Sequence, residues 1–155
     1  MSVNFRSLGL RSDAFVMTGI SVVEDHGDLI VLRTPSEPGY WYGNVVAYKN
    51  APVDPVAEVA AFPTYFPDAD HVQVMWDVPG LAIAPVRAAL VPLGYEVQHI
   101  DVLALRGDIR RVPVPEGITL RPLDGDADWD ALYHLQAMGA DEEGYDPNVH
   151  RPYLK

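Results

Sequence analysis

The chain has 155 residues, of which 48% are hydrophobic and 21% charged, so it has the composition of a folded protein and the length for one domain, or one domain and part of another. It contains no cysteine, which excludes disulfides, thiolate zinc sites and cysteine nucleophiles. No apolar run is long enough to span a membrane and no secretion signal is recognisable, so we expect a cytoplasmic protein without a membrane partner. The formal net charge of −11 disfavours a nucleic-acid partner and favours a cationic or neutral one.

The N-terminal third of the chain predicts three strands in meander order. The first 15 or so residues have no clear period, and we expect a loose lead-in or a short strand there. Apolar residues on both sides of the turn at residues 24–28 then predict a β-hairpin over residues 20–33. After a Pro-Gly turn, three aromatic residues and an apolar run predict a third strand over residues 40–48.

The three adjacent aromatic residues of that predicted strand place large rings on both of its faces. A buried central strand with a bulge at Gly43 explains them by packing alone. A groove beside the strand for a ligand or a partner explains them by function, and both interpretations stay open. On the second, the candidate ligand-binding residues are Tyr40, Trp41, Tyr42 and Asn44, and the ligand is a small cation or amine, since aromatic faces attract cations.

The next segments alternate between helix and strand patterns. Asp54 followed by Pro55 is a helix-start signature and predicts a helix over residues 55–62. Residues 71–76 alternate like a fourth strand, residues 81–93 predict a buried helix that ends at Gly94, and residues 96–105 alternate like a fifth strand. Together these segments predict an α/β (α+β) fold, with a mixed, mostly antiparallel sheet flanked by helices.

The last part of the chain predicts the start of a second unit. We expect a first domain over residues 1–107, a Pro-containing linker over residues 108–116 and an incomplete unit over residues 117–155, with a strand at 118–123 and a helix from Asp126 or Asp128. The apolar residues predicted to share one face of that helix are Trp129, Leu132, Leu135 and Met138. Asp146 and Pro147 repeat the helix-start signature shortly before Lys155, so the unit looks unfinished.

No motif assigns a catalytic residue or a metal site. The acids at residues 124–128 suggest calcium, but the EF-hand pattern needs Gly and Glu where the chain has Trp129 and Leu135, and acids at a helix start explain them better. Asp68, Asp70 and His71 could be metal ligands by type, but a capped turn that enters a strand explains them better. Three other histidines have no partner at metal-ligand spacing: His26, His99 and His150. Neither a nucleophile elbow nor a glycine-rich phosphate loop is present, so a hydrolase triad and common nucleotide binding are not predicted.

Several segments, taken in order, resemble a bacterial family of tandem GNAT N-acetyltransferases. They are residues 8–13, 33–44, 74–77, 93–95 and 119–123, followed by Asp128 and Trp129. In that family an N-terminal GNAT-like half precedes a second half that starts with an Arg-Pro-Leu strand and an Asp-Trp helix. Residues 33–44, from Thr-Pro-Ser to aromatic-Gly-Asn, are the most specific part. The resemblance implies that residues 40–48 are the fourth GNAT strand of the first half.

One departure from the family limits the implied activity. GNAT enzymes hold the pyrophosphate of acetyl-CoA on the N–H groups of a glycine-containing loop between the fourth strand and the next helix. Here residues 48–55 contain no glycine, two prolines and Asp54, which would repel phosphate. We therefore expect a truncated or degenerate GNAT-related protein with little or no transferase activity and no cofactor; acetyl-CoA would be the cofactor of any retained activity. The alternatives are an acidic binding module that uses residues 40–48, and a domain that forms a homodimer through its unfinished unit.

Overall fold

The computed structural model of the protein describes residues 5–142 and residue 144. It divides the chain into two compact units, Met1–Ala104 and Leu105–Lys155, each described here by itself. The predicted helix start at Asp146 lies outside the described residues. Within the described part of the chain, no helix combines the length and the apolar composition that a membrane crossing requires.

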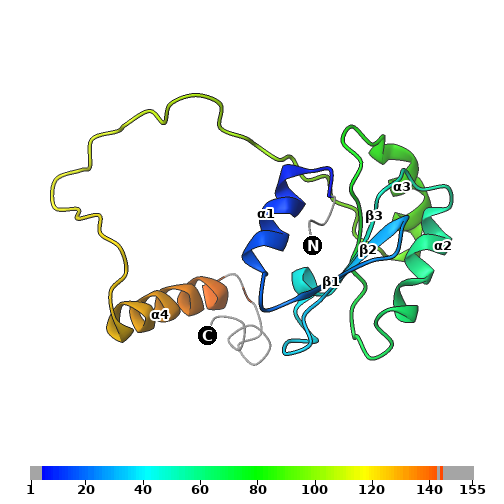
Figure 1. Cartoon of the computed structure of the whole chain (residues 1–155), viewed down its shortest axis with the longest axis horizontal. Coiled ribbons are helices and arrows are strands. Elements are labelled where there is room, and N and C mark those ends of the chain that lie inside the picture. The colour runs from blue at the N-terminus through cyan, green and yellow to red at the C-terminus, as the bar shows by residue number, and fades with distance from the viewer. Residues whose placement is uncertain (1–4, 143, 145–155) are drawn as a thin grey trace. The chain divides into compact units, whose positions relative to one another are not determined.

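A four-stranded sheet forms the centre of the first unit (Figure 1). Its strands are β1 (Val22–Asp25), β2 (Leu29–Arg33), β3 (Val45–Tyr48) and β4 (Val74–Trp76), in that spatial order. The first two pairs are antiparallel, and β3 and β4 are parallel, joined through helix α2 (Pro55–Ala60) as a parallel connection requires. The structure thus confirms the predicted hairpin, the meander and the mixed, mostly antiparallel α/β sheet.

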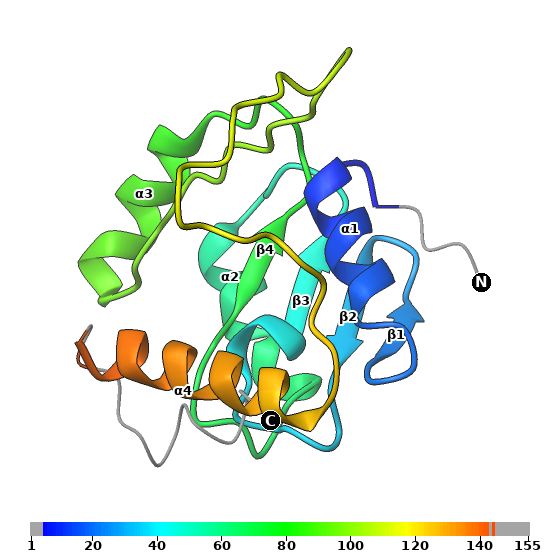
Figure 2. The same cartoon turned by 90° about the vertical axis from the view of Figure 1, so that its left-hand side faces the viewer.

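Helices cover both faces of this sheet (Figure 2). Helix α1 (Leu8–Val16) lies on one face, where Ile30 and Leu32 of β2 pack with Phe5. On the other face Val31 packs with Phe62, next to α2 and α3 (Ile83–Leu90). Alternate residues of β2 and β3 therefore enter two different cores, which explains why both strands are apolar throughout.

Helix α1 corrects the prediction of a loose or extended N-terminal segment. Ser7 caps the helix, because its hydroxyl oxygen accepts the backbone N–H of Leu10 at 3.2 Å. None of the residues of α1 is fully buried. Because so few of its side chains are buried, the apolar residues of α1 recur only weakly at helical spacing. That spacing is the signal from which a helix is predicted, so the sequence prediction did not include α1.

The predicted aromatic strand over residues 40–48 is also wrong in its first half. Residues Trp41–Gly43 form a short 3-10 helix, η1, and β3 begins only at Val45. The two later helices are confirmed with shorter bounds. α2 is followed by the 3-10 helix η2 (Phe62–Thr64), and α3 by η3 (Val91–Leu93), which ends at Gly94 with a φ of 90°.

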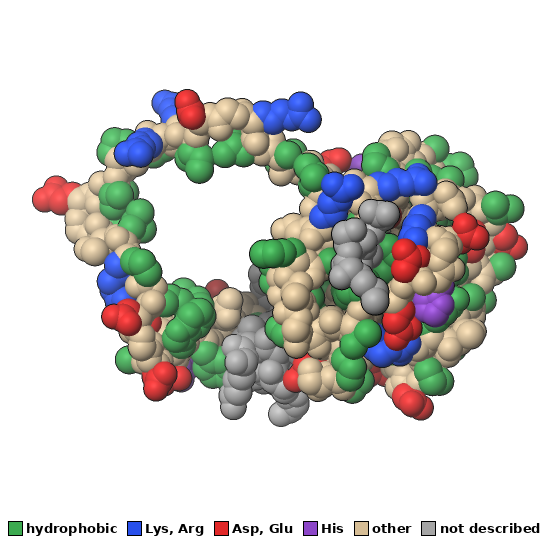
Figure 3. All heavy atoms as spheres, viewed as in Figure 1, with side chains coloured by type: hydrophobic (Ala, Val, Ile, Leu, Met, Phe, Trp, Pro, Cys, Tyr) green, Lys and Arg blue, Asp and Glu red, His purple; other side chains and the backbone are tan. Residues whose placement is uncertain are grey.

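The strands predicted at residues 96–105 and 118–123 are absent from the structure. Both segments alternate like strands, but neither takes part in the hydrogen-bonded ladder of β1–β4, which is the sheet found among the described residues. The first is held instead by α3, where Arg87 Nε donates to the carbonyl of Val97 at 3.3 Å. Many of the apolar side chains of residues 96–123 are exposed, such as that of Leu103 at 93%. Figure 3 shows such side chains in green along the segment that precedes residue 126.

The predicted helix of the second unit is confirmed as α4 (Asp126–Glu142). Its predicted apolar face is wrong, because a step of three residues turns a helix by about 300° and four such positions therefore spread over about half its circumference. Trp129, Leu135 and Met138 are exposed, and Ala137 and Ala140 are the buried residues.

Candidate functional site

The aromatic turn, residues 40–44, takes its shape from the side chain of Asn44. This residue is only 2% exposed. Its Oδ1 accepts the backbone N–H of Thr34 at 3.0 Å, and its Nδ2 donates to the carbonyl oxygens of Glu37, Pro38 and Tyr40 at 2.8, 3.2 and 2.9 Å. The polar atoms of this predicted ligand-binding residue are thus engaged within the loop, so we give Asn44 a structural role.

Gly43 lets the loop close tightly against itself. A Cβ at this position would lie 2.4 Å from both the Thr34 hydroxyl oxygen and a carbon of the Tyr40 ring. The Thr34 hydroxyl also donates to the carbonyl of Gly43 at 2.8 Å. The glycine that suggested a bulge in a strand therefore serves a close approach of backbone and side chains in η1.

The three aromatic residues of the turn point into different surroundings. Trp41 is 59% exposed, and its ring centroid is 6.1 Å from that of His71. Tyr42 is 60% exposed and meets Tyr40 edge-on, with centroids 6.4 Å apart. Tyr40 and Tyr42 line the same pocket and Trp41 does not. Of the four predicted site residues, the structure thus brings two together at a cavity.

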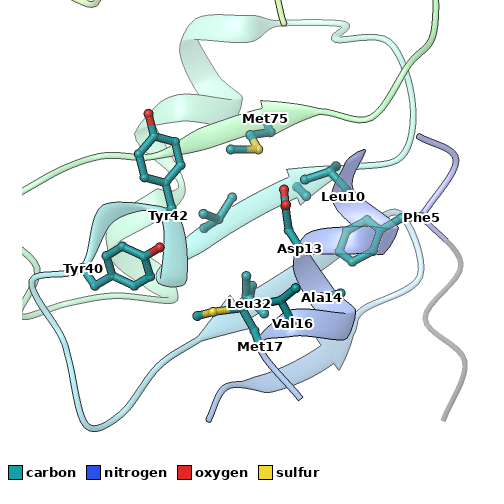
Figure 4. A pocket seen from close by; sticks show the side chains of 12 residues that line it. Phe5, Leu10, Asp13, Ala14, Val16, Met17, Leu32, Tyr40, Tyr42 and Met75 are labelled. Carbon is teal, nitrogen blue, oxygen red and sulfur yellow. The ribbon is translucent and has the colours of Figure 1, made fainter. Parts of the chain in front are cut away.

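That pocket has a volume of about 380 Å³ and lies between α1 and the sheet (Figure 4). Its floor consists of the apolar side chains of Leu32, Val45, Ala47 and Met75, from β2, β3 and β4. Helix α1 forms one wall, and the two tyrosines form another. The lining is mainly apolar, with a few polar groups, and its volume is in the range of small-molecule sites.

Asp13 is the one charged residue among those that line the pocket. It extends from α1 over the sheet, with its carboxylate exposed at the opening (Figure 4). No hydrogen bond or ion pair engages this carboxylate within the part of the chain that the structure describes. The sequence prediction missed Asp13 because it did not include α1; a Ser7 cap followed by Leu10, Ala14 and Met17 is the signal that could have found it.

The turn between β3 and α2 is where the GNAT resemblance implies the acetyl-CoA pyrophosphate. Here Asp54 caps α2, and its Oδ1 accepts the N–H groups of Val56 and Ala57, both at 3.1 Å. Glu58 Oε1 accepts the N–H of Val53 at 3.0 Å, and Pro55 has no N–H. The donors that would bind a phosphate are therefore engaged by two carboxylates that would also repel it, so the residues do not fit this cofactor.

Two properties of the remaining ionisable groups of the described residues bear on function: their suitability for a metal site and the pKa shifts of single groups. No cluster of three or more histidine and acidic side chains suited to a metal occurs among the described residues. Burial, and then the nearby Glu58 and Tyr65, raise the pKa of the Tyr48 phenol. Its hydroxyl therefore stays protonated and donates to the carbonyl of Glu58 at 3.0 Å, which is a structural role.

Comparison with known proteins gives no family assignment. The chain has no match among protein-family models and no significant match among curated proteins or solved structures. The resemblance to GNAT N-acetyltransferases therefore stays a prediction from the sequence segments.

Proposed function

We propose that the first unit is a GNAT-related domain without transferase activity that binds a small organic amine in the pocket beneath α1. The observation that carries this proposal is the carboxylate of Asp13, which stands without a described partner at the opening of an apolar cavity. Such a cavity favours the apolar body of a ligand, and the carboxylate favours a positively charged end over a neutral one.

Two further features support a cationic ligand over an anionic one. Tyr40 and Tyr42 present aromatic rings at the wall of the pocket, and a ring face attracts a cation by about 0.5–1 kcal/mol at an exposed site. No lysine or arginine lines the pocket, and the net charge of −11 raises the local concentration of cations around the whole chain. The proposal keeps two of the predicted site residues, Tyr40 and Tyr42, and adds Asp13.

Loss of the transferase function is supported by the turn between β3 and α2. The carboxylates of Asp54 and Glu58 engage the N–H groups that a pyrophosphate would need. We therefore expect no binding of acetyl-CoA when it is titrated into the full chain in a calorimeter. A dissociation constant in the micromolar range would contradict this part of the proposal.

Amine binding is tested with two probes of nearly the same shape, phenethylammonium and phenethyl alcohol, which differ in charge. Chemical-shift titrations of the full chain should give about three- to tenfold tighter binding of the amine, the ratio expected for one exposed ion pair with an aromatic contribution. In Asp13→Asn the alcohol should bind as before and the preference for the amine should disappear.

The matched control is Asp108→Asn, which removes the same charge from an exposed position in the second unit. This variant should keep the full preference for the amine. Equal binding of both probes to the unaltered chain would refute the charge preference, and no binding of either would refute the pocket as a site for this ligand class.

A further inference from the structure

Helix α1 is tied to the sheet by a buried carboxylate at the end of β4. Asp77 is only 4% exposed. Its two oxygens accept the backbone N–H groups of Arg6 and Ser7, with a distance of 2.8 Å to Ser7. These bonds join residues about 70 positions apart in the sequence, and Ser7 is the N-cap of α1. A hydrogen bond to a charged acceptor is among the stronger ones in proteins.

The other strong attachments of α1 lie at the same end of the helix. Phe5 is buried in the core between α1 and the sheet, and Arg11 Nε donates to its carbonyl at 2.6 Å. Within the helix itself Leu10 and Ala14 are partly buried, and no residue is fully buried. Leu10, Asp13 and Ala14 line the pocket, so α1 forms the wall of the proposed site with side chains that are at most partly buried.

The opposite end of α1 leads into a tight turn. The N–H groups of Ile20 and Ser21 both bond the carbonyl of Met17, at 3.1 and 2.9 Å. Gly19, between Met17 and Ile20, has a φ of 88°, a conformation that glycine adopts without strain. This turn joins α1 to β1 through local hydrogen bonds. Ser21 Oγ also lies 2.6 Å from Thr34 Oγ1, directly after β2, which anchors the end of the turn to the sheet and gives a rotation of the helix a fixed point.

We propose that α1 is a hinged cover of the pocket, with Asp77 as its latch and residues 17–21 as its hinge. The inference rests on the proposed function, because the pocket under the cover is the proposed amine site. In the open state the N–H groups of Arg6 and Ser7 leave Asp77, and Asp13 moves away from the sheet. A ligand that touches both α1 and the floor binds the closed state better and shifts the population toward it.

Hydrogen exchange of the ligand-free full chain tests the latch directly. Asp77→Asn keeps the shape of the side chain and leaves one acceptor oxygen for two N–H groups. Amides of residues 6–17 should exchange about tenfold faster in this variant, the effect of losing one hydrogen bond to a charged group. Amides of β2 and β3 should be unchanged. Unchanged α1 amides, or an equal acceleration of α1 and the sheet, would overturn the proposal.

The matched control is Asp25→Asn in the β1–β2 hairpin. Asp25 also accepts two hydrogen bonds, from Lys49 Nζ at 2.5 Å and from the N–H of Gly27 at 2.9 Å. Neither donor belongs to α1. Exchange of residues 6–17 should stay at the wild-type rate in this variant. A tenfold acceleration there would show that any lost carboxylate loosens α1, which would overturn the specific role of Asp77.

A measurement on the unaltered chain decides the matter if Asp77→Asn does not fold. In low concentrations of urea the α1 amides should exchange through a local opening whose free energy is lower than that of global unfolding. If the α1 amides exchange only together with those of β2 and β3, the hinge is overturned. Saturating phenethylammonium should then slow α1 exchange at least threefold. If the probe binds and leaves that exchange unchanged, the cover is wrong and the site stands. If the latch behaves as expected and the probe does not bind, the site is wrong and the hinge stands.

Discussion

Replacing Asn44 by Asp tests how the aromatic turn is held, because it keeps the size of the side chain and removes its donor. In the structure Nδ2 donates to the carbonyl oxygens of Glu37, Pro38 and Tyr40. A carboxylate oxygen at this place would face three acceptors without a proton to share. The other oxygen could still accept the N–H of Thr34, as Oδ1 does at 3.0 Å.

The expected loss of stability follows from the burial of this position. Asn44→Ala leaves the N–H of Thr34 unsatisfied at a buried site and should cost about 1–3 kcal/mol. Asn44→Asp also buries an unpaired charge and should cost about 3–5 kcal/mol at neutral pH. Burial and the carbonyl oxygens raise the pKa of the new carboxyl group above its unfolded value of about 3.9. The excess cost over Asn44→Ala is therefore smallest below that value and grows as the pH rises through the folded pKa.

Urea unfolding followed by tryptophan fluorescence measures this effect. The free energies of unfolding of the two variants should be compared between about pH 4 and pH 8, because their difference cancels the titration of groups that both chains share. The gap should widen toward high pH. A gap independent of pH, or an Asn44→Asp variant within about 0.5 kcal/mol of the unaltered chain at pH 7, would refute the account of the turn.

Two further predictions concern the turn and the second unit. A Cβ at Gly43 would lie 2.4 Å from two side-chain atoms, so Gly43→Ala should lower the free energy of unfolding, measured in urea, by about 1–3 kcal/mol. Nothing lies within 4 Å of a Cβ at Gly139 in α4, so Gly139→Ala should increase helix stability by about 0.5–1 kcal/mol. A neutral Gly43→Ala would contradict the close approach. Hydrogen bonds from Arg121, and then from a backbone N–H, lower the pKa of the Asp128 carboxyl. The support this pair gives to the start of α4 is therefore present above the unfolded pKa of about 3.9 and is lost as the pH falls through the lower folded value. Arg121→Met should move the titration of Asp128, followed by NMR, to higher pH, and an unchanged midpoint would contradict the pairing.

The elements that the sequence predicts well are those whose signals are local. Apolar runs on both sides of a turn were sufficient for β1 and β2, and Asp54 before Pro55 was sufficient for the start of α2. Residues 96–105 and 118–123 have the same alternation without strand structure, because a strand also needs a neighbour and alternation carries no information on that neighbour.

The site could be predicted only in part, for a related reason. Tyr40 and Tyr42 stand out in the sequence as aromatic neighbours. The turn that contains them is held by Asn44, whose three acceptors lie four to seven positions earlier in the chain, together with Gly43 and the Thr34 hydroxyl. Asp13 lies in residues 8–13, a segment of the family resemblance, but no motif there gives it a role. It becomes a candidate only when α1 packs over β2–β4, and that packing is a tertiary event.

The position of bound phenethylammonium in the full chain tests the central claim most directly. Intermolecular NOEs should join its ring protons to the methyl groups of Leu32 and Met75, on the pocket floor. The carbon next to its ammonium group should show NOEs to the side chains of Asp13 and Tyr40, at the opening. NOEs confined to Trp41 or to residues of the second unit, or saturation without any pocket contact, would contradict the proposed site.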